Sequence, residues 1–388
     1  MPHPLRILLQ VLLLWLAGLG AATQFAKIAV PFAQVAALYP AHADKIGWLL
    51  SVISLIGAIL GALSGAIAGR VGPVRLLMFG LILGGAVSLF QASIPSLGLI
   101  LVSRVVEGVS HLAIVVAAPT LIAQITIGKW RNAALVLWSS FFGVAFALNA
   151  WLGLPLISRV GLPVYFATHG VLMFLIAGLI VSFRPNSASA LANNPFWNVR
   201  TLIGIHVETY RSAFVSAPAL GWFFYTLTFV SLLAILPGRL PDDVSAMIAG
   251  LMPLAGIVIS WITVPVLLNV CSAVFVVTLG FGLSILTIGA LFLGAPLPVV
   301  CIALFAVLGL VQGGSFAAVP QLNSTPESQA LSYGAMAQMG NAGNLLGTPV
   351  LLAILWRTSE AGMLIAVVGF YAVAMALHLW LAARRKRA

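Results

Sequence analysis

The chain has 388 residues, of which 62% are hydrophobic and only 6% are charged, and its mean hydropathy is +1.16. Soluble domains carry about 25% charged residues, so this composition excludes an ordinary soluble protein and indicates a polytopic membrane protein. The net charge of +11 would suit a nucleic-acid partner. We expect none, because the basic residues are dispersed among the connections between apolar runs.

Apolar runs of about 20 residues, the length of a membrane-spanning helix, recur along the whole chain. Their continuity indicates helices, because the strands of a membrane barrel alternate over about ten residues. The sequence therefore predicts an all-α membrane protein with twelve transmembrane helices, over 8–34, 46–68, 74–94, 98–126, 133–157, 163–183, 213–236, 246–268, 272–293, 297–319, 331–355 and 361–383.

The distribution of Lys and Arg predicts the orientation of the chain in the membrane. With a cytoplasmic N-terminus, the basic residues on the outer side are Lys45, Arg159, Arg239 and Arg357, and those within spans are Lys27 and Arg104. All other Lys and Arg fall on the inner side, as the positive-inside rule requires. We expect a multi-pass protein of a bacterial inner membrane with both termini in the cytoplasm.

Segment 184–212 separates six expected spans from six others. It begins with polar residues and Pro and then becomes mildly amphipathic, which fits either a helix lying in the cytoplasmic interface or a solvated linker. The predicted domains are an N-terminal six-helix bundle over 1–183 and a C-terminal six-helix bundle over 213–388. Division into two such halves is common among secondary transporters.

The connection between the second and third spans reads GAIAGRVGPVR and resembles a cytoplasmic loop signature of the major facilitator superfamily. Gly65, Arg70, Gly72 and Arg75 match that signature, whereas Gly69 stands where the family usually has aspartate. The resemblance marks the four matching residues as a conformational motif. The departure at Gly69 puts the family's usual charge clasp in doubt.

Two further segments resemble motifs of the same superfamily. The sequence RVVEG at Arg104–Gly108 is similar to its fourth-span motif, and Pro31 resembles the first-span proline of the drug-antiporter branch. The antiporter signature of the fifth span, a Gly-Pro pair, is absent from SFFGVAFALNA at 140–150.

This resemblance implies two six-helix bundles, each built from inverted three-helix repeats, and transport by alternating access. It further implies that the first, fourth, seventh and tenth helices line a central cavity. Within the superfamily, the chain most resembles the branch of compact bacterial drug and sugar exporters, which are driven by proton antiport.

Four ionisable side chains are placed deep within the expected spans: Lys27, Arg104, Glu107 and His111. Such groups in a membrane need a partner or water. Arg104, Glu107 and His111 are spaced i, i+3 and i+7, which places them on one helix face. One interpretation is a permanent ion pair that only joins the first and fourth spans. The other makes Glu107 the proton-coupling carboxylate, assisted by Arg104 and His111.

Lys27 precedes Pro31 by four residues, at a place where antiporters of this kind often carry a cation-recognising acid. A lysine reverses the sign, so with Arg104 it favours an anionic or zwitterionic solute. Gln24, on the same side of the helix, and Asn149 of the fifth span are further substrate-binding candidates. The alternative is that Lys27 extends to the outer interface.

The second half offers uncharged polar and aromatic candidates for substrate binding, namely Trp222, Tyr225, Gln312, Gln338 and Asn341. Amides and aromatic rings suit a small organic molecule better than a bare ion. Hydrogen bonding between helices is the alternative role for each amide.

The sequence thus predicts a proton-coupled secondary transporter of a small organic solute, with export favoured over import. The alternatives are a proton-coupled importer or facilitator and, less favoured, a non-transporting sensor or assembly factor. An enzyme is not expected, because one carboxylate and one histidine are too few for a buried active site. No nucleotide-binding motif or metal-ligand spacing occurs in the sequence, so we expect no cofactor, no metal and a proton gradient as the driving force. The expected partners are the solute and membrane lipids, with the protein a monomer.

Overall fold

The computed structural model describes residues 4–61, 71–183, 204, 207 and 209–387. Most of the expected linker over 184–212, and Gly65 and Arg70 of the loop motif, lie outside the described residues. The chain forms two compact units, the first comprising Met1–Ile56 and Leu63–Asn194 and the second Gly57–Ala62 and Pro195–Ala388.

Every regular element in the described ranges is a helix, as the long apolar runs predict. In those ranges, ten helical stretches are long and apolar enough to cross a membrane, and Trp48–Leu60 is a shorter apolar helix. The chain is therefore a multi-pass integral membrane protein. One stretch, Phe141–Ser182, has 42 residues and includes most of two predicted spans, 133–157 and 163–183.

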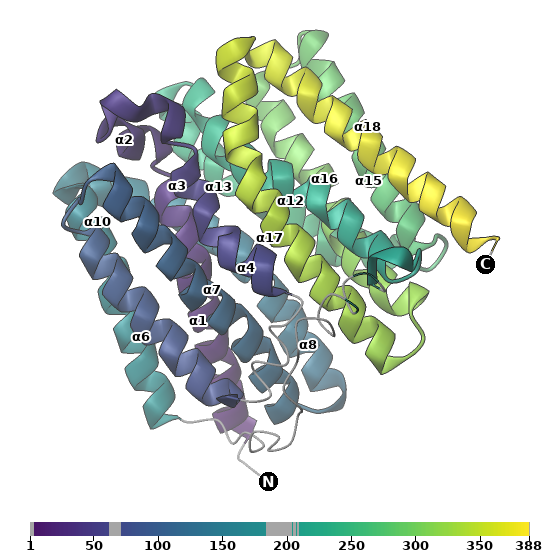
Figure 1. The fold of residues 1–388 in the computed structure, drawn as a ribbon, viewed down its shortest axis with the longest axis horizontal. Coiled ribbons are helices and arrows are strands. Elements are labelled where there is room, and N and C mark those ends of the chain that lie inside the picture. Colours follow the sequence, from purple (N-terminus) through teal and green to yellow (C-terminus); the bar gives the residue numbers. More distant parts are fainter. Residues whose placement is uncertain (1–3, 62–70, 184–203, 205–206, 208, 388) are drawn as a thin grey trace. The chain divides into compact units, whose positions relative to one another are not determined.

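The first unit contains the N-terminal helices up to residue 182, drawn in purple to blue-green in Figure 1. Its elements are α1 (Pro4–Ala29), α2 (Phe32–Ala37), η1 (Pro40–Lys45), α3 (Trp48–Ser51), η2 (Val52–Ser54), α6 (Pro73–Gln91), α7 (Leu97–Ile125), α8 (Gly128–Ser139), α9 (Phe141–Leu148), η4 (Asn149–Gly153) and α10 (Leu154–Ser182). Helix α4 (Leu55–Leu60) crosses the division between the units.

The first predicted span, 8–34, is wrong at its outer end. Helix α1 ends at Ala29, and Pro31 is the N-cap of the short helix α2. A proline has no backbone N–H to continue the helical ladder and disfavours helical backbone at the residue before it, so the chain turns there.

The long stretch Phe141–Ser182 is interrupted at Gly161, whose φ of +80° and ψ of 170° lie outside the helical region. Glycine adopts such a conformation without a side-chain clash. Pro163 follows and favours a new helical start. This interruption falls between the predicted spans 133–157 and 163–183.

Helices α1, α6, α7 and α10 pack against one another in the first unit (Figure 1). Glycines permit some of the closest approaches, because a Cβ atom on Gly84 of α6 would lie 2.5 Å from both the Gln24 amide and the Ser110 hydroxyl. Leu14, Leu77 and Leu121 are completely buried in the apolar core between these helices. This packing brings polar side chains of four helices to one place.

Gly108 of α7 is a position where we expect a clear effect of a single added methyl group. A Cβ atom there would lie 2.1 Å from the Ile53 carbonyl oxygen, which is backbone and cannot rotate away. We expect Gly108→Ala to lower the free energy of unfolding by about 1–3 kcal/mol, measured by denaturant unfolding in detergent micelles.

The matched control is Gly98→Ala in the same helix, where nothing lies within 4 Å of the added atom. Its stability should match that of the wild type or exceed it slightly. Equal stability of Gly108→Ala and Gly98→Ala would contradict the close approach of the Gly108 backbone on α7 to the Ile53 carbonyl on η2.

The second unit, in teal to yellow in Figure 1, holds the remaining helices. They are α12 (Ser216–Ile235), η5 (Pro237–Arg239), α13 (Asp242–Val258), η6 (Ile259–Thr263), α14 (Val264–Leu267), α15 (Ala273–Phe292), α16 (Leu297–Leu322), α17 (Pro326–Arg357) and α18 (Glu360–Arg385). Helix α12 packs against α16, α17 and α18, and α16 also packs against α13 and α15.

Candidate functional site

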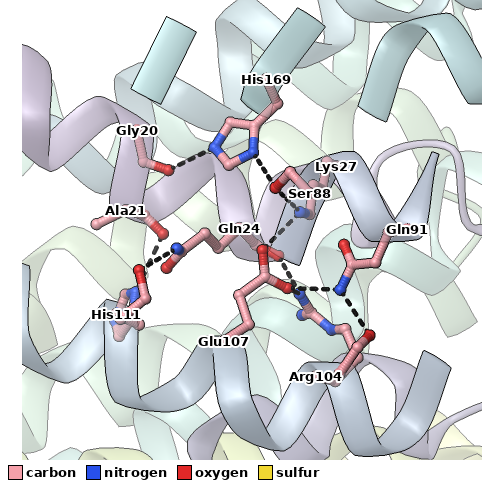
Figure 2. Close-up of polar contacts among 12 residues, drawn as sticks. Gly20, Ala21, Gln24, Lys27, Ser88, Gln91, Arg104, Glu107, His111 and His169 are labelled. Carbon is pink, nitrogen blue, oxygen red and sulfur yellow. Dashed lines mark hydrogen bonds and ion pairs between the residues drawn. The ribbon is translucent and has the colours of Figure 1, made fainter. Parts of the chain in front are cut away.

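Four helices of the first unit contribute to one buried polar cluster (Figure 2). Its hydrogen-bonded members, which we call the charged cluster, are Gln24 and Lys27 of α1, Ser88 and Gln91 of α6, Ser103, Arg104, Glu107 and Ser110 of α7, and His169 of α10. The sequence predicted Gln24, Lys27, Arg104 and Glu107 of this set.

Glu107 lies between two cations at the centre of the cluster. Its Oε1 atom is 2.5 Å from Nζ of Lys27, and its Oε2 atom pairs with Nη1 of Arg104. Oε2 also accepts a hydrogen bond of 3.0 Å from the Gln91 amide. Because the Lys27, Arg104 and Glu107 side chains are all 0% exposed, these ion pairs are shielded from water.

Arg104 makes two contacts that join its helix to others and one within its own helix. Its Nε atom donates to the Leu49 carbonyl at 2.8 Å, and Nη1 donates to the Gln24 carbonyl at 2.7 Å as well as to Glu107. Its Nη2 atom is buried without a hydrogen-bond partner. The guanidinium therefore ties α1, α3 and α7 together and keeps one donor unused.

Lys27 points into the unit and not toward the outer interface, so the alternative of an extended, interfacial Lys27 is wrong. Its Nζ atom donates to Glu107 and, at 2.6 Å, to the hydroxyl of Ser88 on α6. The ammonium also lies 5.9 Å from the centroid of the Phe166 ring. The cation is thus held by groups of three other helices.

Two amides of the cluster keep an acceptor without a partner. Gln24 donates from Nε2 to the Ser110 hydroxyl at 2.7 Å, and Gln91 donates to Ser103 and Glu107, each at 3.0 Å. The Oε1 atom of each amide is buried and has no hydrogen-bond partner. Buried polar atoms without a partner are uncommon in proteins, and each of these two oxygens can accept a further hydrogen bond.

His111 lies beside the cluster but is not bonded to Glu107. Its Nδ1 atom is 3.0 Å from the Ala21 carbonyl oxygen, and its ring packs edge-on against Phe25 with centroids 4.9 Å apart. The helical spacing does place it on the side of α7 that faces α1. Its role in proton coupling remains a prediction.

His169 is a functional candidate that the sequence analysis missed. That analysis placed only four ionisable side chains deep within the spans and left out this histidine. Its Nδ1 atom is 2.7 Å from the Ser88 hydroxyl, and its Nε2 atom is 3.0 Å from the Gly20 carbonyl oxygen. A histidine in the apolar run 163–183 was a usable signal. His378 of α18, also buried, was missed in the same way.

Asn149 is separate from the charged cluster. Its Nδ2 atom donates to Thr23 at 3.2 Å and to the Ala145 carbonyl at 2.7 Å, and its Oδ1 atom accepts from the Tyr165 hydroxyl. The residue therefore joins η4 to α1 and α10. These contacts fill its donors and one acceptor position, and its role in substrate binding remains a prediction.

Three of the second-unit candidates lie together. The rings of Trp222 and Tyr225 are stacked with centroids 4.6 Å apart, and the Tyr225 hydroxyl donates to Oε1 of Gln312 at 3.3 Å. Helices α12 and α16 thus present an aromatic pair beside an amide.

Gln338 and Asn341 of α17 are engaged differently. Gln338 accepts from the Tyr210 hydroxyl at 2.9 Å and donates to the Ala58 carbonyl at 3.1 Å. Asn341 donates to the Ala337 carbonyl of its own helix at 2.8 Å. Neither contact joins them to the aromatic pair.

Of the loop motif, Gly72 and Arg75 are described. Gly72 is the N-cap of α6 with φ of +89°, a conformation that favours glycine, and Arg75 is exposed in the first turn of that helix. No group of three His, Cys, Asp or Glu side chains in the described ranges is placed to hold a metal ion.

The sequence profile of the Major Facilitator Superfamily matches residues 12–348. No curated protein matches the chain in a sequence search.

Proposed function

Since the chain belongs to the major facilitator superfamily, a family of transporters, we propose that it is a proton-coupled secondary transporter of a small organic anion or zwitterion. It works by alternating access, with Glu107 as the coupling carboxylate. The proton gradient is the driving force, and no cofactor takes part.

The observation that carries the proposal is the position of Glu107, fully buried between Lys27 of α1 and Arg104 of α7. An ionised carboxylate is stabilised there by both cations. A movement that separated α1 from α7 would remove one of them and make proton uptake by Glu107 more favourable. Protonation is then linked to the conformation of the first unit, which is the requirement for coupling.

The charge balance of the cluster supports an anionic or zwitterionic solute. Two cations face one carboxylate, so one positive charge remains in excess. The unpartnered Nη2 atom of Arg104 is a donor that a carboxylate or phosphate of the solute can accept from. In the second unit, the stacked pair Trp222 and Tyr225 beside Gln312 supports an organic rather than an inorganic solute.

We propose export as the direction, on the short connections between spans and on the resemblance of Pro31 to the first-span proline of the drug-antiporter branch. The distribution of basic residues supports both termini in the cytoplasm, and we propose a bacterial inner membrane as the location. We propose that the protein acts as a monomer surrounded by lipid.

A thermal-shift screen tests the substrate class. Organic monocarboxylates and dicarboxylates, phosphorylated sugars, amino acids and neutral sugars are added to the purified protein. We expect the largest stabilisation from an anionic or zwitterionic compound, because ligands stabilise the folded state that binds them. Lys27→Met removes the excess positive charge. We expect the apparent affinity for that compound, derived from the thermal shifts, to fall at least about tenfold in this variant.

Arg239→Ala is the control for this screen. Arg239 is an exposed cation of η5, 3.8 Å from Glu360 and remote from the charged cluster in sequence. It should leave the shift unchanged. An undiminished shift in Lys27→Met, measured against that variant's own baseline, would remove Lys27 from solute binding.

A further inference from the structure

We propose that His169 is a second proton-binding group of the charged cluster, connected to Glu107 through Lys27 and Ser88. The inference rests on the proposed function and adds to it a place on α10 where the coupled proton is held.

The four side chains form one continuous hydrogen-bonded chain across three helix-to-helix contacts (Figure 2). Oε1 of Glu107 is 2.5 Å from Nζ of Lys27, which is 2.6 Å from Oγ of Ser88. That hydroxyl is 2.7 Å from Nδ1 of His169. Each link is short enough for proton transfer along it.

The direction of each hydrogen bond follows from which atoms can donate. The Gly20 carbonyl, 3.0 Å from Nε2 of His169, can only accept, so Nε2 carries a hydrogen. The Lys27 ammonium can only donate, so the Ser88 oxygen accepts from it. Ser88 then donates to Nδ1, the unprotonated nitrogen of a neutral ring, whose lone pair accepts this hydrogen bond. The contacts therefore orient His169 to receive a proton at Nδ1.

The other buried imidazoles of the described chain lack this connection. Nδ1 of His111 contacts the Ala21 carbonyl oxygen, and both ring nitrogens of His378 are buried without a partner. Among these imidazoles, His169 alone is joined by hydrogen bonds to a side chain that contacts Glu107.

The proton transfer balances without any added reactant. An N–H bond of the Lys27 ammonium breaks as an O–H bond forms on Ser88, and the original Ser88 hydroxyl proton forms the Nδ1–H bond of His169. The O–H bond of protonated Glu107 then breaks and restores the Lys27 ammonium. The sum is Glu107 carboxylic acid plus neutral His169 giving Glu107 carboxylate plus imidazolium.

The charges that face His169 act in opposite senses, because the two cations oppose a proton on the ring and the carboxylate favours it. Lys27 of α1 and Glu107 and Arg104 of α7 act on it electrostatically. Helix α6 supplies the Ser88 hydroxyl, and its one ionisable residue, Arg75, is at the far end in the first turn. A proton held on Glu107 abolishes both ion pairs of the cluster, whereas a proton held on His169 leaves both in place.

The test is ¹⁵N NMR of the full chain labelled in its histidine rings and inserted in lipid nanodiscs, titrated from about pH 8 to about pH 5 with no solute present. The His169 signals are identified by their loss in His169→Gln or His169→Asn. We expect the Nδ1 signal to change from that of a hydrogen-bond acceptor to that of a protonated nitrogen. His378→Gln should leave this change unaltered.

Two variants test the connection. Ser88→Ala should shift the Nδ1 signal of the neutral ring and displace the titration, and Ser88→Thr, which keeps the hydroxyl, should restore both. Glu107→Gln should displace the same titration. A His169 ring that stays neutral wherever the protein remains folded would overturn the inference, as would a titration identical in the wild type, Ser88→Ala and Glu107→Gln.

Because this experiment measures proton binding without transport, its outcome is separable from that of the proposed function. A titrating His169 in a protein without proton-driven transport would refute the transport proposal. Proton-driven transport with a ring that stays neutral would refute only the inference about His169.

Discussion

Glu107→Gln is expected to abolish the accumulation of solute against its gradient while leaving downhill exchange measurable. The amide has nearly the same shape as the carboxyl group but cannot release a proton, so the substitution separates coupling from solute binding. With one proton per solute, a gradient of one pH unit corresponds to about 1.4 kcal/mol and sustains about tenfold accumulation. We expect that tenfold ratio to fall to about one.

The measurement uses proteoliposomes with an imposed pH gradient, a clamped membrane potential and the compound that gives the largest thermal shift. Glu360→Gln is the matched acid-to-amide control, because Glu360 is 37% exposed and pairs only loosely with Arg239. It should accumulate solute like the wild type. Undiminished accumulation by Glu107→Gln would clear Glu107 of the coupling role.

The same substitution should also have the largest effect on stability. Without the carboxylate, the buried cations Lys27 and Arg104 have no counter-charge. Loss of one partner of a buried ion pair costs about 3–5 kcal/mol, and we expect the free energy of unfolding of Glu107→Gln to fall by at least that amount. Lys27→Met should cost less, because the Arg104–Glu107 pair that remains is balanced.

Denaturant unfolding in mixed micelles compares the two variants with their double variant. The double variant leaves one uncompensated cation instead of two, so its loss should be smaller than the sum of the single losses. Glu360→Gln should change stability by only about 0–1 kcal/mol. A Lys27→Met variant as unstable as Glu107→Gln, with additive losses, would contradict the description of Glu107 as the shared anion.

Much of the fold follows from the sequence because the length and continuity of apolar runs are local properties. The helices α6, α7, α12, α15, α16 and α18 agree with the predicted spans to within a few residues. The errors arise where one residue overrides the pattern, as Pro31 does at the end of α1. The count of twelve helices and the inverted repeats remain predictions.

The core of the candidate site was predictable because its groups are rare in a membrane. Lys27, Arg104 and Glu107 are costly to bury alone, so their mutual contact could be inferred from their depth in two spans. Gln91 and Ser88 could not be found in this way, because polar uncharged residues are common in membrane helices and only the packing of α6 against α1 and α7 selects these two.

The second-unit candidates show the same limit. Trp222 and Tyr225 are close because a spacing of three residues brings side chains together on a helix, which the sequence shows directly. The partners of Gln338 and Asn341 depend on which helix lies opposite and at what height. That information is not local, so the sequence could not assign their roles.

The central claim is that Glu107 exchanges a proton when solute binds. Purified protein in weakly buffered micelles is mixed with the compound that gives the largest thermal shift, and a pH-sensitive dye follows the proton exchange. Linkage predicts an exchange of about one proton per bound solute in the wild type and in Glu360→Gln, and none in folded Glu107→Gln. Solute binding with no proton exchange in the wild type, or with the same exchange in Glu107→Gln, would contradict the account.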